Sequence, residues 1–111
     1  MSRKNLLTTS PPYAVGQALN RLGANLRTAR LRRNLSLEEA AAKIGTGVRA
    51  VRDAENGLPG SSAAVYVALL WAYDLLGLFE TVADPAQDEE GLARESVRKR
   101  ARAQKGLSND F

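Results

Sequence analysis

The sequence predicts an all-α fold, and three observations support this prediction. Apolar residues recur at steps of three and four, as they do on one face of an amphipathic helix. No stretch alternates β-branched and polar residues for long enough to form a strand. Residues that cap or end helices stand between the periodic stretches and divide the 111-residue chain into short segments. We therefore expect five helices, followed by a basic C-terminal tail or helix.

The first predicted helix runs from Pro12 to about Arg33. Proline suits the first turn of a helix because the N–H that it lacks would have no partner there. Asn34 then tolerates the left-handed backbone of a tight helix exit. The apolar face of this helix consists of Val15, Leu19, Leu22, Leu26 and Ala29.

Two short helices around a glycine-containing turn should follow. Ser36 caps the first of them, Leu37–Ile44, and Glu39 completes a capping box that stabilises the helix by about 1 kcal/mol. The Gly-Thr-Gly segment at 45–47 forms the turn, and the second helix is Val48–Glu55, directly before an Asn-Gly pair. Two short helices joined in this way form a helix-turn-helix unit.

A fourth and a fifth helix complete the predicted domain. The fourth begins after Ser61 or Ser62 and ends at Gly77, and the fifth spans 78–83. The apolar members of the fourth helix include Val65, Leu69 and Tyr73. The chain thus divides into a flexible arm over 1–12, a folded domain over 13–84, and an acidic linker with a basic tail over 85–111. Because the tail holds few apolar residues, it is either unstructured or a helix that needs a partner.

Charge is segregated along the chain, although the formal net charge is only +4. Residues 1–52 hold ten basic and two acidic side chains, and residues 53–90 hold eight acidic and no basic ones. Residues 91–111 are basic again, with six basic and two acidic side chains. We expect a polyanion to meet one face of the protein, with the acidic block turned away from it.

The composition argues against an enzyme or a metal protein. With no Cys and no His, the chain lacks the usual zinc ligands, the commonest general base and any disulfide. The first residues lack the apolar core of a signal peptide, and the longest apolar stretch, Ala63–Ala72, is about half of the roughly 20 residues needed to span a bilayer. We expect a cytoplasmic, nucleoid-associated protein with no catalytic residue, no cofactor, no metal and no membrane contact.

The stretch LGANLRTARLRRNLSLEEAAAKIGTGVRAVRDAENG resembles the helix-turn-helix domain of the XRE superfamily, which includes the lambdoid phage repressors. The resemblance covers residues 22–78. Ala41 stands where the family has a small residue at the contact of the two short helices, Gly45 at the turn, and Val51 at the core position of the second helix. The resemblance also implies a structural ion pair between Arg30 and Glu55.

In this family the second short helix lies in the major groove of DNA, with its N-terminal side chains at base edges. The resemblance therefore implies a base-reading set of Val48, Arg49, Arg52 and Asp53. Arg49 either matches the O6/N7 edge of guanine, with about 1–3 kcal/mol of discrimination, or contacts a phosphate. Val48 either meets a thymine methyl group or packs as a staple, and Asp53 either accepts from cytosine N4 or steers Arg49.

A second set of residues would hold the DNA backbone, with surface solvation as the alternative for its cations. The set comprises Arg32, Arg33, Ser36, Lys43, Thr46 and Gly47. Ser36 stands at a helix start, where backbone N–H groups also suit an anion. The sequence departs from the family at Gly47, where a Ser or Thr usually caps the recognition helix and donates to a phosphate.

The segment from Pro59 onward is similar to HipB-like antitoxins, in which an aromatic-rich helix, a short helix, an acidic Asp-Pro linker and a basic end follow the DNA-binding unit. The pairs Leu70-Trp71 and Asp84-Pro85 carry this likeness together with Asp88, although core packing is the simpler role for the tryptophan. The likeness implies an antitoxin that neutralises a HipA-type serine/threonine kinase toxin and represses the shared operon. A stand-alone prophage-type regulator and a protein-interaction adaptor without DNA readout are the alternatives.

One short helix touches too few bases for a unique site, so we expect a homodimer on a palindromic operator in double-stranded DNA. The expected dimer contact consists of Leu78, Phe79 and Val82, which little of the remaining chain can cover. In the tail, a basic helical face would be formed by Arg94, Arg98, Arg102 and Lys105. That face is an electrostatic arm on DNA, which we favour, or a docking surface for a toxin, and the two roles do not exclude each other.

Overall fold

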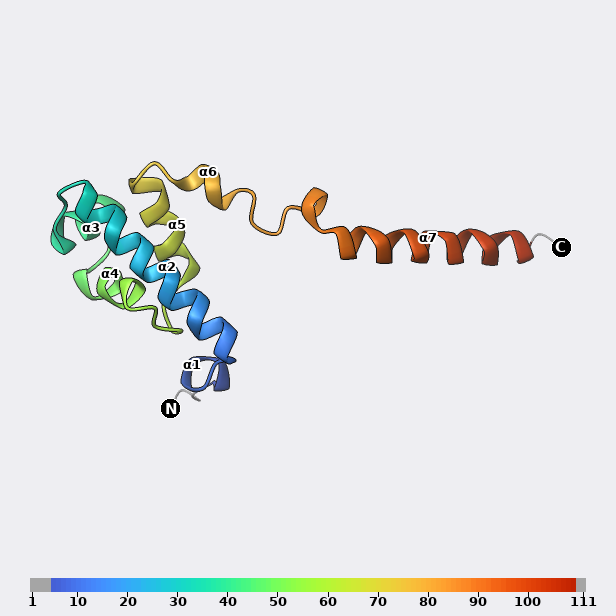
Figure 1. Cartoon of the computed structure of the whole chain (residues 1–111), viewed down its shortest axis with the longest axis horizontal. Coiled ribbons are helices and arrows are strands. Elements are labelled where there is room, and N and C mark those ends of the chain that lie inside the picture. Colours follow the sequence, from blue (N-terminus) through green and yellow to red (C-terminus); the bar gives the residue numbers. More distant parts are fainter. Residues whose placement is uncertain (1–4, 110–111) are drawn as a thin grey trace. The chain divides into compact units, whose positions relative to one another are not determined.

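The computed structural model describes residues 5–109, and helices account for its regular structure (Figure 1). The elements are α1 (Leu6–Thr9), α2 (Tyr13–Arg32), α3 (Leu37–Ile44), α4 (Val48–Glu55), α5 (Ala63–Ala72), α6 (Leu76–Phe79), the 3-10 turn η1 (Pro85–Gln87) and α7 (Glu89–Asn109). No strand occurs among the described residues, and the all-α prediction is confirmed. The chain forms two compact units: α1 to α6 belong to the first, which ends at Phe79, and η1 and α7 belong to the second.

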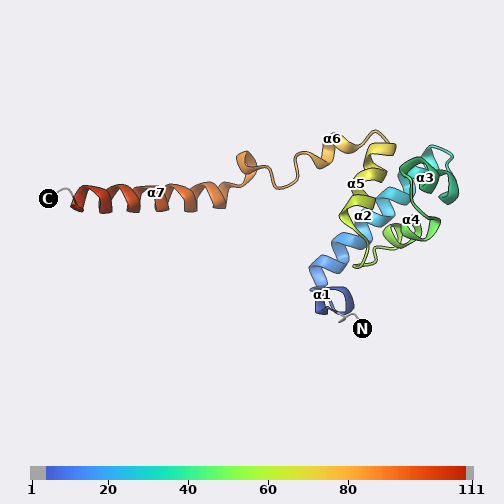
Figure 2. The same cartoon turned by 180° about the vertical axis from the view of Figure 1, so that it is seen from behind.

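The core of the first unit lies where α2, α3, α4 and α5 meet, as both views of the cartoon show (Figures 1 and 2). From α3 it receives Ala40 and Ala41, and from α4 it receives Val51 and Ala54, all of them fully buried or nearly so. The large side chains of the core are Leu26, Leu69 and Tyr73. The predicted burial of Ala41 and Val51 is therefore confirmed.

Local sequence signals place the ends of the two short helices. Directly after α2, Asn34 adopts a left-handed backbone with φ 55°. The Ser36 hydroxyl oxygen accepts a hydrogen bond from the Glu39 N–H at 3.0 Å, and the Glu39 carboxylate accepts one from the Ser36 N–H at 3.1 Å. Gly45 ends α3 with φ 76°, which glycine adopts without a Cβ clash. Both α3 and α4 have the predicted bounds.

The end of α5 and the position of α6 differ from the prediction. Ser62 caps α5 as expected, but the helix ends at Ala72 because Asp74 takes a left-handed backbone with φ 59°. Gly77, the predicted stop, lies inside α6, and the helix predicted over 78–83 is instead Leu76–Phe79. The prediction was wrong because aspartate, like glycine, can reverse the chain at a helix end.

Two apolar residues that were assigned to helix faces in the core are exposed. Val15 is 38% exposed because it lies in the first turn of α2, before the residues that pack against the core, which begin with the partly buried Leu19 and continue to the buried Leu26 and Ala29. Trp71 is 56% exposed, so its predicted role in core packing is wrong. It stands two residues after the buried Leu69, which is about 200° of rotation around a helix with 3.6 residues per turn.

Two helices lie outside the five that were predicted. In the segment predicted as a flexible arm, the Asn5 side chain accepts a hydrogen bond from the Leu7 N–H at 2.8 Å and caps α1. In the predicted tail, the Asp88 carboxylate accepts a hydrogen bond from the Gly91 N–H at 3.0 Å at the start of α7. Of the two alternatives for the tail, the described residues thus adopt the helix.

Candidate nucleic-acid interface

Helix α4 presents two arginines on its exposed side. Val51, Ala54 and Glu55 are buried, whereas Arg49 and Arg52 are exposed. Because these arginines are three residues apart, their side chains lie on neighbouring positions of the helix surface. Within the described chain neither forms an ion pair, since the three pairs present involve other arginines and a lysine. Both guanidinium groups are therefore available to an anion from outside.

The two other predicted base readers are less accessible. Val48 is half-buried and packs against the core, as its alternative role of staple requires. Asp53 is also half-buried, and no ion pair between residues 5 and 106 joins its carboxylate to Arg49. The exposed side of α4 is thus formed mainly by its two arginines.

The starts of α3 and α4 are capped differently. The hydroxyl oxygen of Ser36 accepts within the capping box, which leaves its hydrogen to be donated to another group. Gly47 caps α4 in extended backbone, with φ −79° and ψ 157°, and makes no side-chain hydrogen bond. Of the remaining predicted phosphate ligands near this turn, Thr46 is half-buried and Lys43 is exposed on the last turn of α3.

Arg33 is engaged within the fold. Its two terminal guanidinium nitrogens donate to the Ala29 carbonyl at 2.9 Å and to the Tyr73 carbonyl at 2.7 Å. The guanidinium carbon lies 5.6 Å from the centroid of the Tyr73 ring, in cation–π geometry. Arg33 therefore connects α2 to the end of α5, and a phosphate contact would compete with these bonds. The neighbouring Arg32 is exposed.

A buried ion pair fixes the C-terminal end of α4. Arg30 donates from Nε to Glu55 Oε2 at 2.7 Å and from Nη2 to Oε1 at 3.0 Å, which is a bidentate pair. Its Nη1 donates to the Leu35 carbonyl at 2.9 Å. Hydrogen bonding to the carboxylate raises the pKa of the Arg30 guanidinium above its usual value. This pair, which the family resemblance implied, orients α4 against α2 and does not face solvent.

Gly23 also positions α4, and no sequence motif indicated its role. A Cβ at this residue would lie 2.5 Å from the Glu55 carbonyl oxygen and 2.6 Å from the Ala54 carbonyl oxygen. Only glycine therefore lets α2 approach the last turn of α4 this closely. The one available signal was its place inside a predicted helix, where glycine costs about 1 kcal/mol relative to alanine.

A family model described as a helix-turn-helix domain matches residues 21–78, just over half of the chain. The chain belongs to this helix-turn-helix family. The matched residues include α3, α4 and the turn between them, so the exposed arginines of α4 stand on the second helix of the motif. Membership places this helix-turn-helix protein among DNA-binding regulators. No curated protein and no solved structure matched the chain.

The residues predicted for dimer contact and for the tail lie at two further places on this helix-turn-helix protein. Leu78 and Phe79 are exposed on α6 in the first unit, whereas Val82 is exposed in the second. The predicted dimer contact is therefore divided between the units. The tail set, Arg94, Arg98, Arg102 and Lys105, lies on α7 and is exposed.

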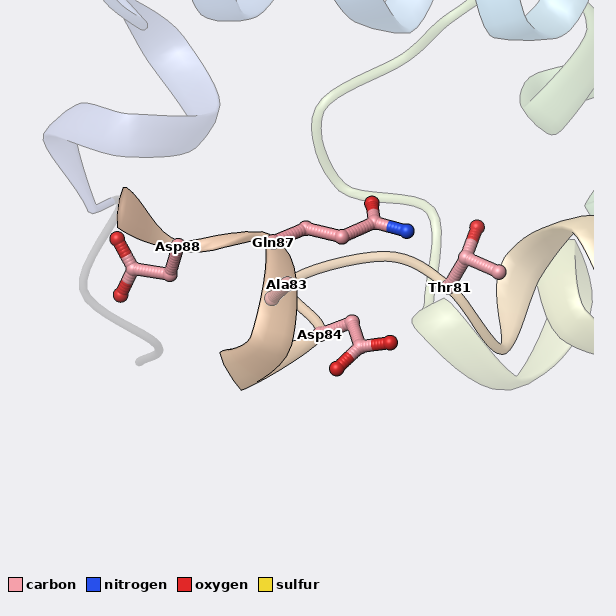
Figure 3. A pocket seen from close by; sticks show the side chains of 5 residues that line it. All are labelled: Thr81, Ala83, Asp84, Gln87 and Asp88. Atoms are coloured by element: carbon pink, nitrogen blue, oxygen red, sulfur yellow. The ribbon is translucent and has the colours of Figure 1, made fainter. Parts of the chain in front are cut away.

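A pocket in the second unit is lined by Thr81, Ala83, Asp84, Gln87 and Asp88 (Figure 3). The carboxylates of Asp84 and Asp88 point away from each other, and each caps a helical turn, Asp84 by accepting from the Ala86 N–H at 2.9 Å. Across the described part of the chain, no three acidic side chains gather closely enough to hold a metal ion. In that part, too, every helix is too short or too polar to cross a membrane.

Proposed function

We propose that this protein is a sequence-specific transcriptional repressor that binds a palindromic operator as a homodimer and serves as the antitoxin of a type II toxin-antitoxin system. In this proposal it represses its own operon in the cytoplasm, on the nucleoid, and neutralises a HipA-type kinase toxin. It acts by binding alone, without catalysis or a cofactor. The observation that supports DNA readout is the pair of exposed arginines on α4, a helix whose opposite side is held in the core.

Arg49 is the proposed base reader. It is the second residue of α4, and N-terminal side chains of such a helix reach base edges in the major groove. Its guanidinium can donate two parallel hydrogen bonds to O6 and N7 of guanine. Arg52 lies three residues further along and contacts a base or a phosphate. Because the Arg30–Glu55 pair already fixes α4, docking orders little additional structure.

The antitoxin role is supported by the exposed aromatic side chain of α5. This helix carries no charged residue, and helices that are apolar on all sides are normally buried. More than half of Trp71 is nevertheless exposed. Tryptophan is enriched at the centres of protein interfaces, where it fills a pocket of the partner. A toxin that covers this residue would account for its position.

One observation favours a second candidate, a protein-interaction adaptor without DNA readout. Gly47 offers no hydroxyl group at the start of α4, so one usual phosphate contact is missing. Steep salt dependence of binding to the protein's own promoter would count against this candidate, and tighter binding to the promoter than to a random duplex would exclude it. A stand-alone regulator differs in having no toxin partner, and a kinase-like reading frame beside its gene would argue against it.

The experiment for DNA readout compares Arg49→Ala with Arg27→Ala, which removes an exposed arginine from α2. Binding to a promoter duplex and to a random duplex is measured by fluorescence anisotropy. Arg49→Ala should weaken promoter binding by about 1–3 kcal/mol and leave random binding nearly unchanged. Arg27→Ala should affect both duplexes equally, if at all. Equal losses on both duplexes for Arg49→Ala would refute base readout by this residue.

The toxin part is tested with Trp71→Ala. Because the side chain is exposed, the variant should fold and bind the promoter normally. Co-expression with the proposed HipA-type kinase should then show loss of neutralisation. If the variant neutralises the toxin fully, Trp71 does not form the proposed contact.

A further inference from the structure

We propose that α7 is a second DNA contact, an electrostatic arm that binds phosphates through a basic face formed by Arg98, Arg102 and Lys105. The inference rests on the proposed function because it needs a duplex that α4 has already bound. It adds a contact outside residues 21–78, the segment that matches the helix-turn-helix family.

Two of the cations of α7 form ion pairs within the helix. Arg94 pairs with Glu90 at 2.5 Å and Lys99 with Glu95 at 3.0 Å, each four residues apart. Four exposed cations of α7 have no carboxylate within ion-pair distance among residues 5–106: Arg98, Arg100, Arg102 and Lys105. The uncompensated positive charge of α7 therefore lies from Arg98 onward. Arg94 belongs to the predicted basic face but is left out of the proposed arm, because the Glu90 carboxylate offsets its charge.

The helix gathers three of these four cations on one face. Residues four and seven positions apart lie within about 60° of one another around an α-helix, so Arg98, Arg102 and Lys105 point to the same side. They extend along about 10 Å of the helix axis. A length of about 10 Å of duplex carries about six phosphate charges, enough to meet all three. Arg100 lies on the opposite side, about 200° from Arg98.

The apolar side chains of α7 fit a protein groove poorly. Helices that dock in such grooves present apolar anchors at steps of three, four and seven. Leu92 and Val97 are both exposed, and they lie about 140° apart around the helix. Neither has an apolar residue larger than alanine three, four or seven positions later within the side chains described. Because α7 offers charge without an apolar stripe, it fits a polyanion.

DNA is the polyanion that the rest of the chain already recruits. Once α4 is docked, the binding of α7 to the same duplex becomes intramolecular, so weak phosphate contacts gain a high effective concentration. Phosphate contacts of this kind add affinity and salt dependence but no sequence information.

The experiment is the salt dependence of promoter binding for the full chain and for R98Q/R102Q/K105Q, between about 50 and 200 mM salt. Each phosphate contact contributes about 0.9 to the logarithmic slope, so the triple variant should flatten it by about 2.7 per bound chain. Across that range the wild-type protein should lose about 40-fold more affinity per chain than the variant. The matched pair is R102Q, expected to lower the slope by about 0.9, and R100Q, expected to leave it unchanged.

The possible results separate the fate of the arm from that of the proposed function. A flattened slope for the triple variant and for R102Q, with R100Q unchanged and helix content equal by circular dichroism, supports the arm. Promoter-selective binding with the same slope in all variants overturns the arm alone and leaves the proposed function intact. If the triple variant keeps its slope but loses toxin neutralisation, α7 binds the toxin and the arm is overturned. A wild-type protein that does not distinguish promoter from random duplex overturns both proposals.

Discussion

Arg30 and Glu55 carry buried charges that compensate each other, and removing one charge leaves the other unpaired inside the protein. Glu55→Gln should therefore destabilise the fold by about 3–5 kcal/mol in urea unfolding. The double variant R30M/E55M removes both charges and should be more stable than the single variant. If the two variants were equally destabilised, desolvated charge would not be the cause.

Tyr73 places a hydroxyl group in the core, where no described residue hydrogen-bonds it. Burial raises the pKa of the phenol above its usual value, while Arg30 and Arg33 oppose the shift. Since the folded state holds this proton to higher pH than the unfolded chain does, the associated stability is complete below pH about 10 and is lost as the pH rises through the folded-state pKa.

Tyr73→Phe should consequently stabilise the protein by about 1 kcal/mol at neutral pH, because an unpartnered buried hydroxyl is removed. It should also reduce the loss of stability in alkaline solution. Urea unfolding of both proteins at neutral pH and above pH about 10 measures the two effects. Identical pH profiles would show that another group causes the alkaline loss.

The residues that sequence analysis could assign are those whose partners are near in the chain or that match a family motif. Ser36 and Glu39 are three residues apart, so their capping box was predictable. Arg33 caps a carbonyl 40 residues away at Tyr73, and Gly23 is required by a carbonyl oxygen of Glu55. Such contacts depend on tertiary packing, which no local pattern encodes. The Arg30–Glu55 pair was predictable only through the family resemblance.

At the scale of elements, the contact of α2 with α4 depends on Gly23. Gly23→Ala should destabilise the protein by about 1–3 kcal/mol, because overpacking at the α4 carbonyls outweighs the better helix propensity of alanine. Gly16→Ala is the matched control in the same helix, where a Cβ meets nothing within 4 Å. That variant should have a free energy of unfolding higher by about 0.5–1 kcal/mol. Thermal unfolding of the pair provides the test, and a stable Gly23→Ala protein would contradict the close approach.

The start of α4 can be given the cap that it lacks. Gly47 has extended backbone and open space around its Cβ position, so Gly47→Ser fits without strain. The new hydroxyl should stabilise α4 by a few tenths of a kcal/mol and raise DNA affinity about 2- to 10-fold through one phosphate hydrogen bond. Gly47→Ala supplies the Cβ without the hydroxyl and serves as the control. If both variants bound DNA equally, the phosphate would not reach this position.

The predicted bounds of a helix were right where a residue near its end stops the helix by itself. The capping box marks the start of α3 and Gly45 marks its end. The apolar spacing that begins after Gly47 marks the start of α4. The end of α5 instead depends on the backbone of Asp74 and on a hydrogen bond donated by Arg33 to Tyr73. An apolar run with no interruption could not show which of its residues, Trp71 among them, would remain outside the core.

At the scale of the whole molecule, we expect a symmetric dimer with half-sites about 34–36 Å apart, or a multiple of that spacing. Phe79→Asp should weaken the dimer if α6 forms the contact, since it places a charge on an exposed apolar residue of that helix. Val82→Asp tests the second unit separately. Sedimentation of each protein with and without operator DNA is the measurement. A wild-type monomer at micromolar concentration in both conditions would contradict the dimer.

In the folded protein, several residues of the acidic sequence block are engaged in structural contacts. Within the acidic block, Glu55 is buried in an ion pair, Asp84 and Asp88 cap helical turns, and Glu90 pairs with Arg94. These four carboxylates have structural partners within the protein. Counting charges along the chain could not separate them from those left to repel a polyanion.

Trp71 is the only tryptophan of the chain, and more than half of its surface is in contact with solvent. Its indole fluorescence therefore reports on one known position without any label. Emission from the isolated protein should lie at the long wavelengths of a solvated indole. Any partner that covers the outer face of α5 will shift that emission to shorter wavelengths and protect it from a soluble quencher, so the spectrum reads the occupancy of this surface directly.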